Sequence, residues 1–457
     1  MHIIILGAGD LGKQLAWTLC ERPNAVAVVD ESAGLLERLK ERLDVMTVQG
    51  DCANFSVLKN AGVRQADILI AATGSDASNV LACQIARHFG VKKTICRLSS
   101  HGFFSEKDGF PASTVGIDHV IFPQEETVER ITYVLRHKSL VERIRFDVPG
   151  TQMTALHISN VSPLVGVQLR DFPHPELLSR LRFSAIVRDR SLEYPHGDTV
   201  LQGGDEVYVS GDSQSVESLM DLADPDHQPF SLVVVAGITR VSKILIQRLL
   251  EQGYKVRVVA ENVTAGERLL DDLPEKVMVI NGNPTESDVL EEAEVSDCGA
   301  FISTMRADEE NILSGLLAKK MGADKVITVT NKAEYMDIVP ALSTIDCGFS
   351  PRLVAVNAVL NLLGTETARV HAILHRFHAY VYEFEVQEGS PLCGKLIEDF
   401  ESTPSTIFSL VFRDNRMIPA TGDVRLQAGD QVAAITTPEV ERLLEPLFRK
   451  HSILSRK

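Results

Sequence analysis

Short apolar runs alternate with segments of helical period over the first 123 residues. The segment between the first two runs carries Leu11, Leu15 and Leu19, which fall on one face of a helix. The apolar runs are residues 3–6, 26–29, 45–48, 67–72, 94–98 and 119–122. Alternating strands and helices predict a parallel sheet with helices on both faces, joined by right-handed crossovers. We therefore predict a Rossmann-like, doubly wound α/β domain.

The same pattern returns after residue 229, which indicates a tandem repeat. Gly237 follows Gly7 by 230 residues and Asn311 follows Asn79 by 232, each at the same place in its pattern. A proline and a helical pattern follow each Rossmann-like half, and we expect these helices to be connectors. The connectors are residues 125–136, after Pro123, and 353–363, after Pro351.

A smaller unit of α+β type follows each connector. Ser162-Pro-Leu-Val-Gly166 corresponds to Ser390-Pro-Leu-Cys-Gly394, and in both units a Gly-Asp pair precedes a strand and a terminal helix. We predict two Rossmann-like domains, each followed by a small α+β domain. The expected bounds are 1–123 and 229–348 for the Rossmann-like domains, and 143–227 and 368–453 for the small ones.

Composition excludes several classes of protein. The 457 residues are 44% apolar and 24% charged, as in soluble globular proteins, with no apolar stretch of the roughly 18 to 20 residues that span a bilayer. A formal charge of −16 argues against binding to nucleic acid or, unaided, to anionic lipid. Seven cysteines without C-x-x-C spacing favour reduced thiols in the cytoplasm over a disulfide framework or zinc site.

A glycine turn follows the first predicted strand. In Gly7-Ala8-Gly9-Asp10-Leu11-Gly12, the first glycine permits a sharp turn, the second lets backbone amides approach a pyrophosphate, and the third lets the helix pack on the sheet. Asp30 ends the next strand, where a carboxylate accepts hydrogen bonds from adenosine ribose hydroxyls and repels a 2′-phosphate. NAD-type cofactors or adenine nucleotides are therefore favoured over NADP.

Other candidates lie at the carboxyl ends of neighbouring strands. Arg97 ends the fifth strand, where we expect it to contact phosphate rather than a surface acid. Thr73 and Gly74 either line the cleft or belong to a Thr-x-x-Asp helix cap. Asp51 and Cys52 either approach an adenine or simply turn the chain.

The second copy has lost much of this pattern. Its turn reads Gly237-Ile-Thr239-Arg-Val-Ser242, and a branched Thr239 obstructs phosphate approach. Glu261 matches Asp30, but Asn331 ends the strand that corresponds to the one ending in Arg97. We expect one competent nucleotide site per chain and leave open what the second cleft binds.

Metal and catalytic signals are weak. His371, His375 and His378 have helical metal-ligand spacing, but a strand pattern follows and the first copy lacks them, so we expect surface histidines. An NAD-dependent dehydrogenase is the alternative to a binding protein, yet the small domains offer no acid-base constellation. Duplication with one degraded site favours regulation over catalysis.

The four-domain order, together with these motifs, resembles the tandem form of the regulator-of-potassium-conductance (RCK/KTN) family, the regulatory subunits of bacterial Trk potassium uptake systems. The resemblance covers essentially the whole chain. It implies a non-enzymatic, cytoplasmic protein that binds peripherally to the inner face of the cell membrane through an integral, TrkH/TrkG-like potassium-translocating subunit. It further implies a homotetramer that gates this partner in response to NAD(H) or ATP/ADP. The implied nucleotide-binding residues are Gly7, Ala8, Gly9, Asp10, Leu11, Gly12, Asp30, Asp51, Cys52, Thr73, Gly74 and Arg97.

Overall fold

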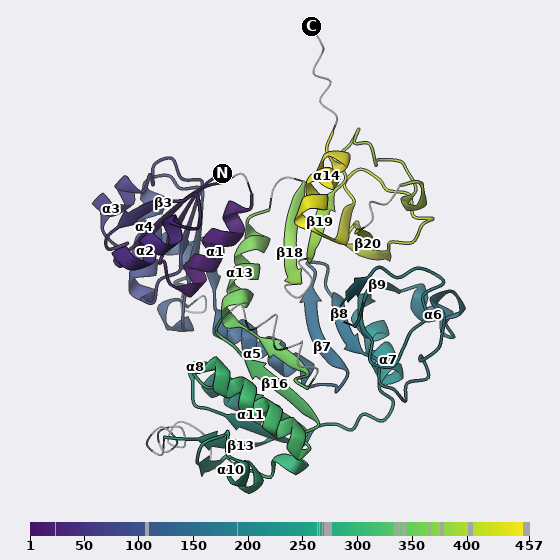
Figure 1. Cartoon of the computed structure of the whole chain (residues 1–457). Coiled ribbons are helices and arrows are strands. Elements are labelled where there is room, and N and C mark those ends of the chain that lie inside the picture. The colour runs from purple at the N-terminus through teal and green to yellow at the C-terminus, as the bar shows by residue number, and fades with distance from the viewer. Residues whose placement is uncertain are drawn as a thin grey trace. The chain divides into compact units, whose positions relative to one another are not determined.

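The computed structural model forms four sheets (Figure 1). It describes residues 1–450 except 23, 106–108, 190, 263, 265, 267, 269–276, 333–334, 336–338, 340–343, 365–366, 375–378 and 401–404. The chain divides into two compact units. The first contains Met1–Thr127, Asn331–Ala333 and Ser350–Val359, and the second contains Val128–Thr330, Glu334–Phe349 and Leu360–Lys457.

The first unit contains a six-stranded parallel sheet of order β3-β2-β1-β4-β5-β6. Its elements are β1 (His2–Leu6), α1 (Asp10–Cys20), β2 (Ala25–Asp30), α2 (Ala33–Lys40), β3 (Met46–Gln49), α3 (Phe55–Asn60), β4 (Ile68–Ala71), α4 (Asp76–His88), β5 (Lys93–Arg97), β6 (His119–Ile121) and the start of α5 (Pro123–Val134). The strand order reverses between β1 and β4, and ligands of doubly wound folds bind at such a reversal.

The second unit contains a sheet of the same order, β14-β13-β12-β15-β16-β17. Its elements are β12 (Leu232–Ala236), α8 (Arg240–Glu251), β13 (Lys255–Ala260), β14 (Val277–Asn281), α10 (Ser287–Glu292), β15 (Ala300–Ser303), α11 (Asp308–Met321), β16 (Lys325–Val329) and β17 (Cys347–Phe349). The helix α13 (Pro351–Leu362) follows. The predicted fold class and the duplication are both confirmed.

Two small antiparallel sheets also lie in the second unit, with orders β10-β9-β11-β8-β7 and β18-β19-β22-β20-β21. The first has β7 (Leu140–Arg145), β8 (Thr151–His157), α6 (Pro175–Leu178), β9 (Leu181–Arg188), β10 (Ser191–Glu193), β11 (Glu206–Asp212) and α7 (Ser213–Ala223). The second has β18 (Ala368–Leu374), β19 (Ala379–Glu385), β20 (Ile407–Arg413), β21 (Arg416–Pro419), β22 (Gln431–Thr436) and α14 (Pro438–Phe448). Buried side chains of both sheets, such as Tyr208 and Val381, form one core.

The Gly-Asp pairs of the small domains have a structural role. Asp205 accepts two hydrogen bonds of 2.8 Å from the Arg188 guanidinium, and Asp430 accepts two of 2.7 Å from Arg413. Each carboxylate also accepts a backbone amide of its own turn. Bidentate pairs of this kind are strong and specific in geometry, so these aspartates hold the turn against the sheet.

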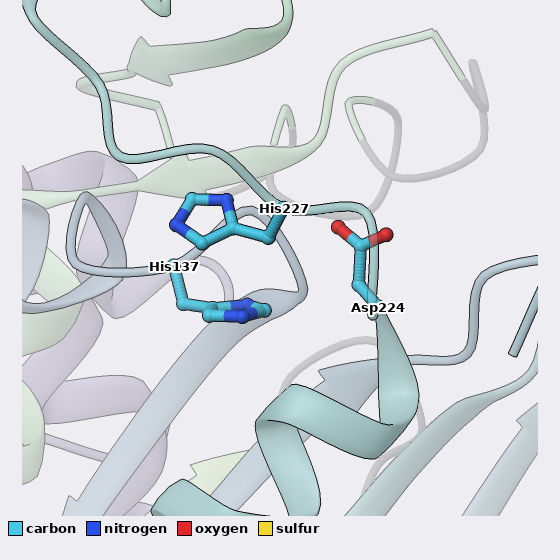
Figure 2. Close-up of side chains that lie close together, drawn as sticks. All are labelled: His137, Asp224 and His227. Carbon is cyan, nitrogen blue, oxygen red and sulfur yellow. The ribbon is translucent and has the colours of Figure 1, made fainter.

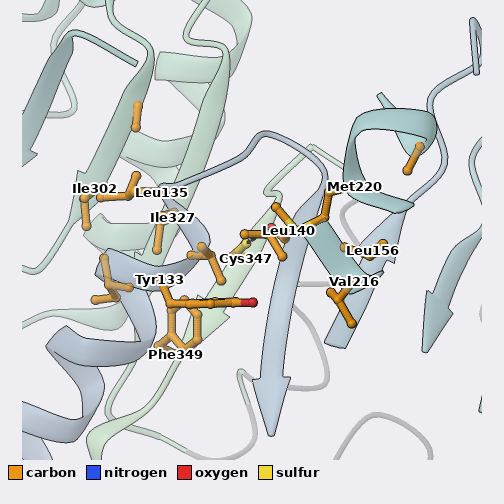
Figure 3. Close-up of a cluster of buried hydrophobic side chains, with 14 of the residues drawn as sticks. Tyr133, Leu135, Leu140, Leu156, Val216, Met220, Ile302, Ile327, Cys347 and Phe349 are labelled. Carbon is orange, nitrogen blue, oxygen red and sulfur yellow. Dashed lines mark hydrogen bonds between the residues drawn. The ribbon is translucent and has the colours of Figure 1, made fainter. Parts of the chain in front are cut away.

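The connector helices are exchanged between the two copies. From Val128 onward α5 belongs to the unit that holds the second Rossmann-like sheet, and residues 350–359, at the start of α13, belong to the unit that holds the first. In α5 and just beyond it, Tyr133 and Leu135 share a buried core with Ile302 and Ile327 of the second sheet (Figure 3).

A buried lysine holds the end of α5. Lys325, at the start of β16, is fully buried, and its Nζ donates to the carbonyl oxygens of Val134 at 2.8 Å, His137 at 3.0 Å, Lys138 at 3.2 Å and Leu140. Burial lowers the pKa of Lys325. The carbonyls at a helix C-terminus lack intrahelical partners and attract cations, so this contact satisfies both sides.

Two imidazole rings, inclined at 42° to each other, lie next to the backbone that Lys325 binds, and Figure 2 shows them. The rings of His137 and His227 have centroids 4.0 Å apart, and His137 is buried. Backbone amides of Ser139 and Lys138 donate to their Nδ1 atoms, at 3.2 Å for His137 and 3.3 Å for His227. Burial, followed by the charges of His227 and Lys325, lowers the pKa of His137 to about 4.

We predict that Lys325→Met lowers the free energy of unfolding by about 3 kcal/mol, because several buried carbonyls lose their donor. The matched control is Lys320→Met on the exposed face of α11, where we expect a change of less than about 0.5 kcal/mol. Chemical denaturation followed by circular dichroism measures both. Equal effects of the two substitutions would show that the Lys325 contacts contribute no net stability.

We also predict a loss of stability below neutral pH. An unfolded histidine has a pKa of about 6.5, so between about pH 6.5 and the folded value of about 4 the unfolded chain gains a proton that folded His137 excludes. The melting temperature should therefore decrease as the pH is lowered from about 6.5 to about 4. In His137→Asn the slope should be smaller, whereas His196→Asn, at an exposed histidine, should keep the parent slope.

Candidate functional site

The glycine turn lies at the reversal point of the first sheet. Gly7 has φ +99°, which favours glycine, and a Cβ there would lie 3.1 Å from the Ala72 carbonyl oxygen after β4. At Gly12 a Cβ would collide with the Gly7 carbonyl oxygen. The structural reasons predicted for these two glycines therefore agree with the geometry.

Gly9 has no packing role. It is the N-cap of α1, with φ −64°, and a Cβ there would meet nothing within 4 Å. Gly9 has no side chain with which to cap this helix. The first amides of an α-helix have no intrahelical acceptor, and together with the helix dipole they form an anion site. The space over Gly9 is thus open to an anion.

Asp30 lies directly beside the turn. Its Oδ2 accepts from the Ala8 amide at 2.6 Å, and its Oδ1 accepts from the Ser32 amide at 2.8 Å. Each carboxylate oxygen accepts more than one hydrogen bond. The carboxylate therefore fixes the turn while it keeps acceptor capacity for a pair of hydroxyl groups.

Asn79 joins the carboxyl ends of β4 and β5, a role that we did not predict. Its Oδ1 accepts from the Thr73 amide at 3.0 Å and the Thr73 hydroxyl at 2.6 Å, and its Nδ2 donates to the Arg97 carbonyl at 2.9 Å. It is fully buried. It recurs as Asn311, which accepts from the Met305 amide and donates to the Met305 and Val329 carbonyls, and this recurrence is the signal that could have revealed the role.

The structure brings Thr73 and Arg97 together. Arg97 Nη1 donates to the Thr73 carbonyl at 2.9 Å, which holds the guanidinium at the end of β4. The helix-cap reading of Thr73 is wrong, because Ser75 is the N-cap of α4 and accepts from the Ser78 amide. Gly74 has no atom within 4 Å of a Cβ position.

Asp51 and Cys52 follow β3, whose end pairs with Asp30. The Gly50 amide donates to the Asp30 carbonyl, and Asp51 accepts the Ala53 amide at 2.8 Å, as a turn residue does. Cys52 is buried, and burial followed by the Asp51 charge raises its pKa to about 11. Contact of either residue with an adenine stays a prediction.

The second glycine turn satisfies its own amides. The Thr239 hydroxyl accepts from the Ser242 amide, and the Ser242 hydroxyl accepts from the Thr239 amide at 2.6 Å, which forms a capping box. Two donors that would face a phosphate are thereby occupied. Gly237 keeps φ +93°, so the sharp turn persists without the open amides.

The histidine predictions need one correction. His371 lies in strand β18, is buried and contacts Glu383 at 2.9 Å, so the expectation of a surface histidine is wrong for this residue. A register shift between Val370 and Ala372 interrupts the strand there. His375 and His378 lie outside the described residues.

His137, Asp224 and His227 place potential metal-ligand atoms within 4.8 Å of one another (Figure 2). Both Nδ1 atoms accept backbone amides, so in each neutral ring the proton resides on Nε2. A metal ligand must instead offer an unprotonated nitrogen, and its other nitrogen usually donates. We therefore interpret this cluster as a structural contact between the end of α7 and the end of α5 rather than as a metal site.

Comparison with known proteins gives a consistent result. The TrkA-N domain model matches residues 3–123 and 233–348, and the TrkA-C domain model matches residues 153–224 and 381–449. The Trk system potassium uptake protein TrkA of Halomonas elongata is 31% identical over 97% of this chain and 99% of its own length.

Two solved structures share the fold. The GsuK channel bound to NAD has a TM-score of 0.63 at 18% identity, covering 98% of this chain and 78% of that one. GsuK bound to ADP has a TM-score of 0.50 at 15% identity, covering 79% and 68%. Two pairs of family domains and a relative matched nearly from end to end lead to one conclusion: the chain belongs to the TrkA family of Trk-system potassium uptake proteins.

Proposed function

We propose that this protein is the nucleotide-binding regulatory subunit of a Trk-type potassium uptake system and that it gates a membrane partner. The main observation in support is that the first backbone amides of α1, which begins after Gly9, are uncapped and that the Asp30 carboxylate is fixed beside them. This pairing suits a ligand with a phosphate linkage and a ribose. Family membership supplies the potassium transport context.

The proposed ligand is NAD(H) or ATP/ADP. Asp30 would accept the ribose hydroxyls and repel a 2′-phosphate, which disfavours NADP. Arg97, held over Thr73, would contact the phosphates. The NAD and ADP complexes of GsuK, a protein of the same fold, support both ligand types.

Regulation is favoured over the dehydrogenase alternative. Hydride transfer to a small substrate needs an acid or base and an anion-binding group near the nicotinamide. Among the described residues, the thiol of Cys52 is held neutral, and the Gly-Asp carboxylates of the small domains are engaged by arginines. Turnover of an added hydroxy or amino acid with NAD would instead support the enzyme.

The proposed partner is an integral potassium-translocating subunit of the TrkH/TrkG kind, contacted at the inner face of the cell membrane by a homotetramer of this chain. In the part of the chain that the structure describes, no helix is both long and apolar enough to cross a bilayer. A near-complete switch between two states would need about 5.5 kcal/mol of differential ligand binding. Several sites in one assembly could share that requirement.

We predict that Gly9→Ala leaves the melting temperature unchanged or slightly raised and weakens binding of NADH and ATP by about tenfold or more, because its methyl group fills the open phosphate space. Gly34→Ala, also without neighbours within 4 Å, is the matched control and should keep the parent affinity. Gly12→Ala should instead impair folding itself, because its Cβ meets backbone. Calorimetric titration with NAD, NADH, ADP and ATP, alongside thermal melting, distinguishes these cases. Parent-like affinity in Gly9→Ala would contradict the proposed site.

We predict one nucleotide per polypeptide, since the capping box of the second turn occupies the amides that a phosphate needs. Titration with the tightest nucleotide, combined with a mass measurement of the assembly, gives the ratio. Two equivalent sites per chain would refute this. The double substitution Thr239→Gly and Ser242→Gly gives a second check. If the parent binds one nucleotide per chain, as we predict, the double variant binds one or two. If the parent already binds two, the double variant should still bind two.

A further inference from the structure

A salt bridge joins the first glycine turn to the helix that follows the second Rossmann-like sheet. Arg352 Nη2 lies 2.7 Å from Asp10 Oδ2, and both residues belong to the first compact unit. Asp10 is the first residue of α1, and Arg352 is the second residue of α13. The N-termini of two helices therefore approach the same point, beside the amides over Gly9.

The position of Arg352 is unfavourable for its own helix. A cation in the first turn of a helix opposes the helix dipole and so destabilises the helix. α13 has no acidic residue in that turn. Asp10, in contrast, stands where an anion is favoured. The placement of Arg352 therefore serves the contact at the glycine turn rather than the stability of α13.

The two copies differ at both positions of this contact. With Pro351 aligned to Pro123, Arg352 corresponds to Gln124, and Asp10 corresponds to Arg240 in the second turn. The connector of the second copy thus brings an arginine to the turn with open amides, whereas the equivalent residue of the first connector, Gln124, is neutral.

We infer that Arg352 is a phosphate-binding residue of the first nucleotide cleft, supplied by the connector helix of the second copy. In the structure the Asp10 carboxylate binds the Arg352 guanidinium. Asp10 is 63% exposed at its side chain and Arg352 is 30% exposed, so both ends can reorient when a ligand arrives. A diphosphate or triphosphate at the amides over Gly9 then takes the place of Asp10, because guanidinium and phosphate form strong charge-assisted pairs.

This inference rests on the proposed nucleotide site and adds a mechanical consequence. Arg352 directly follows β17 and Pro351 in the chain. A phosphate that replaces Asp10 as the partner of Arg352 would change the contact that binds the start of α13. One bound nucleotide would thereby act on a helix of the second copy through a single side chain.

The test compares three variants of the full-length protein by calorimetric titration with ATP, ADP and NADH. Adenosine, measured as a competitor of NADH, is the ligand without phosphate. Arg352→Gln should weaken the three phosphate ligands by about tenfold and adenosine by less than about twofold. Arg352→Lys should recover part of the loss, since it keeps the charge without the planar fork.

Asp10→Asn distinguishes ligand contact from a merely structural bridge. If Arg352 binds phosphate, this variant should bind ATP as well as or better than the parent, because the competing anion is gone. If Arg352 acts only by holding the turn through Asp10, Asp10→Asn and Arg352→Gln should weaken ATP and adenosine alike, which would overturn the inference. Absence of nucleotide binding in the parent protein would instead refute the proposed function, and Arg352→Gln with parent affinity for all ligands would refute this inference alone.

Discussion

The end of α5 is held against the second Rossmann-like sheet by one buried ammonium group. Lys325 belongs to the second Rossmann-like sheet, yet its Nζ is surrounded by carbonyl oxygens from the end of α5 and the start of β7. An unpaired charge in such a place would cost several kcal/mol. The chain must therefore place those carbonyls around Lys325 whenever it folds. The path from the first Rossmann-like domain into the second unit is fixed accordingly.

The two copies solve the same problem of helix termini differently. Every helix that follows the first strand of such a domain begins with amides that lack acceptors. In the second copy Thr239 and Ser242 satisfy them with their own hydroxyls. In the first copy Gly9 leaves them open. Sheet order and the Arg-Asp pairs of the small domains are retained in both copies. The copies thus differ at the place where an anion would bind, while sheet order and the Arg-Asp pairs are retained.

Local patterns predicted the strands, the duplication and the glycine turn, because the causes of these features lie within a few residues of one another. The roles of Asn79 and Lys325 depend on partners in other elements, and the buried environment that makes them necessary is not visible in a linear pattern. His371 was misjudged for a related reason. Its spacing from later histidines imitates a helix, whereas pairing with β19 sets its conformation and Glu383 binds its Nε2 atom.

A sensor needs a ligand contact that differs between arrangements of the protein, because a ligand shifts an equilibrium only by its differential affinity. Contacts within one rigid Rossmann-like domain, such as the proposed contact of Asp30 with a ribose, would supply affinity but no such difference. Arg352 reaches the first turn from a helix that begins immediately after the second sheet. If Arg352 binds phosphate as we infer, its distance from that phosphate would depend on where the start of α13 lies. One nucleotide cleft would then be enough for a ligand response that also involves a helix of the second copy.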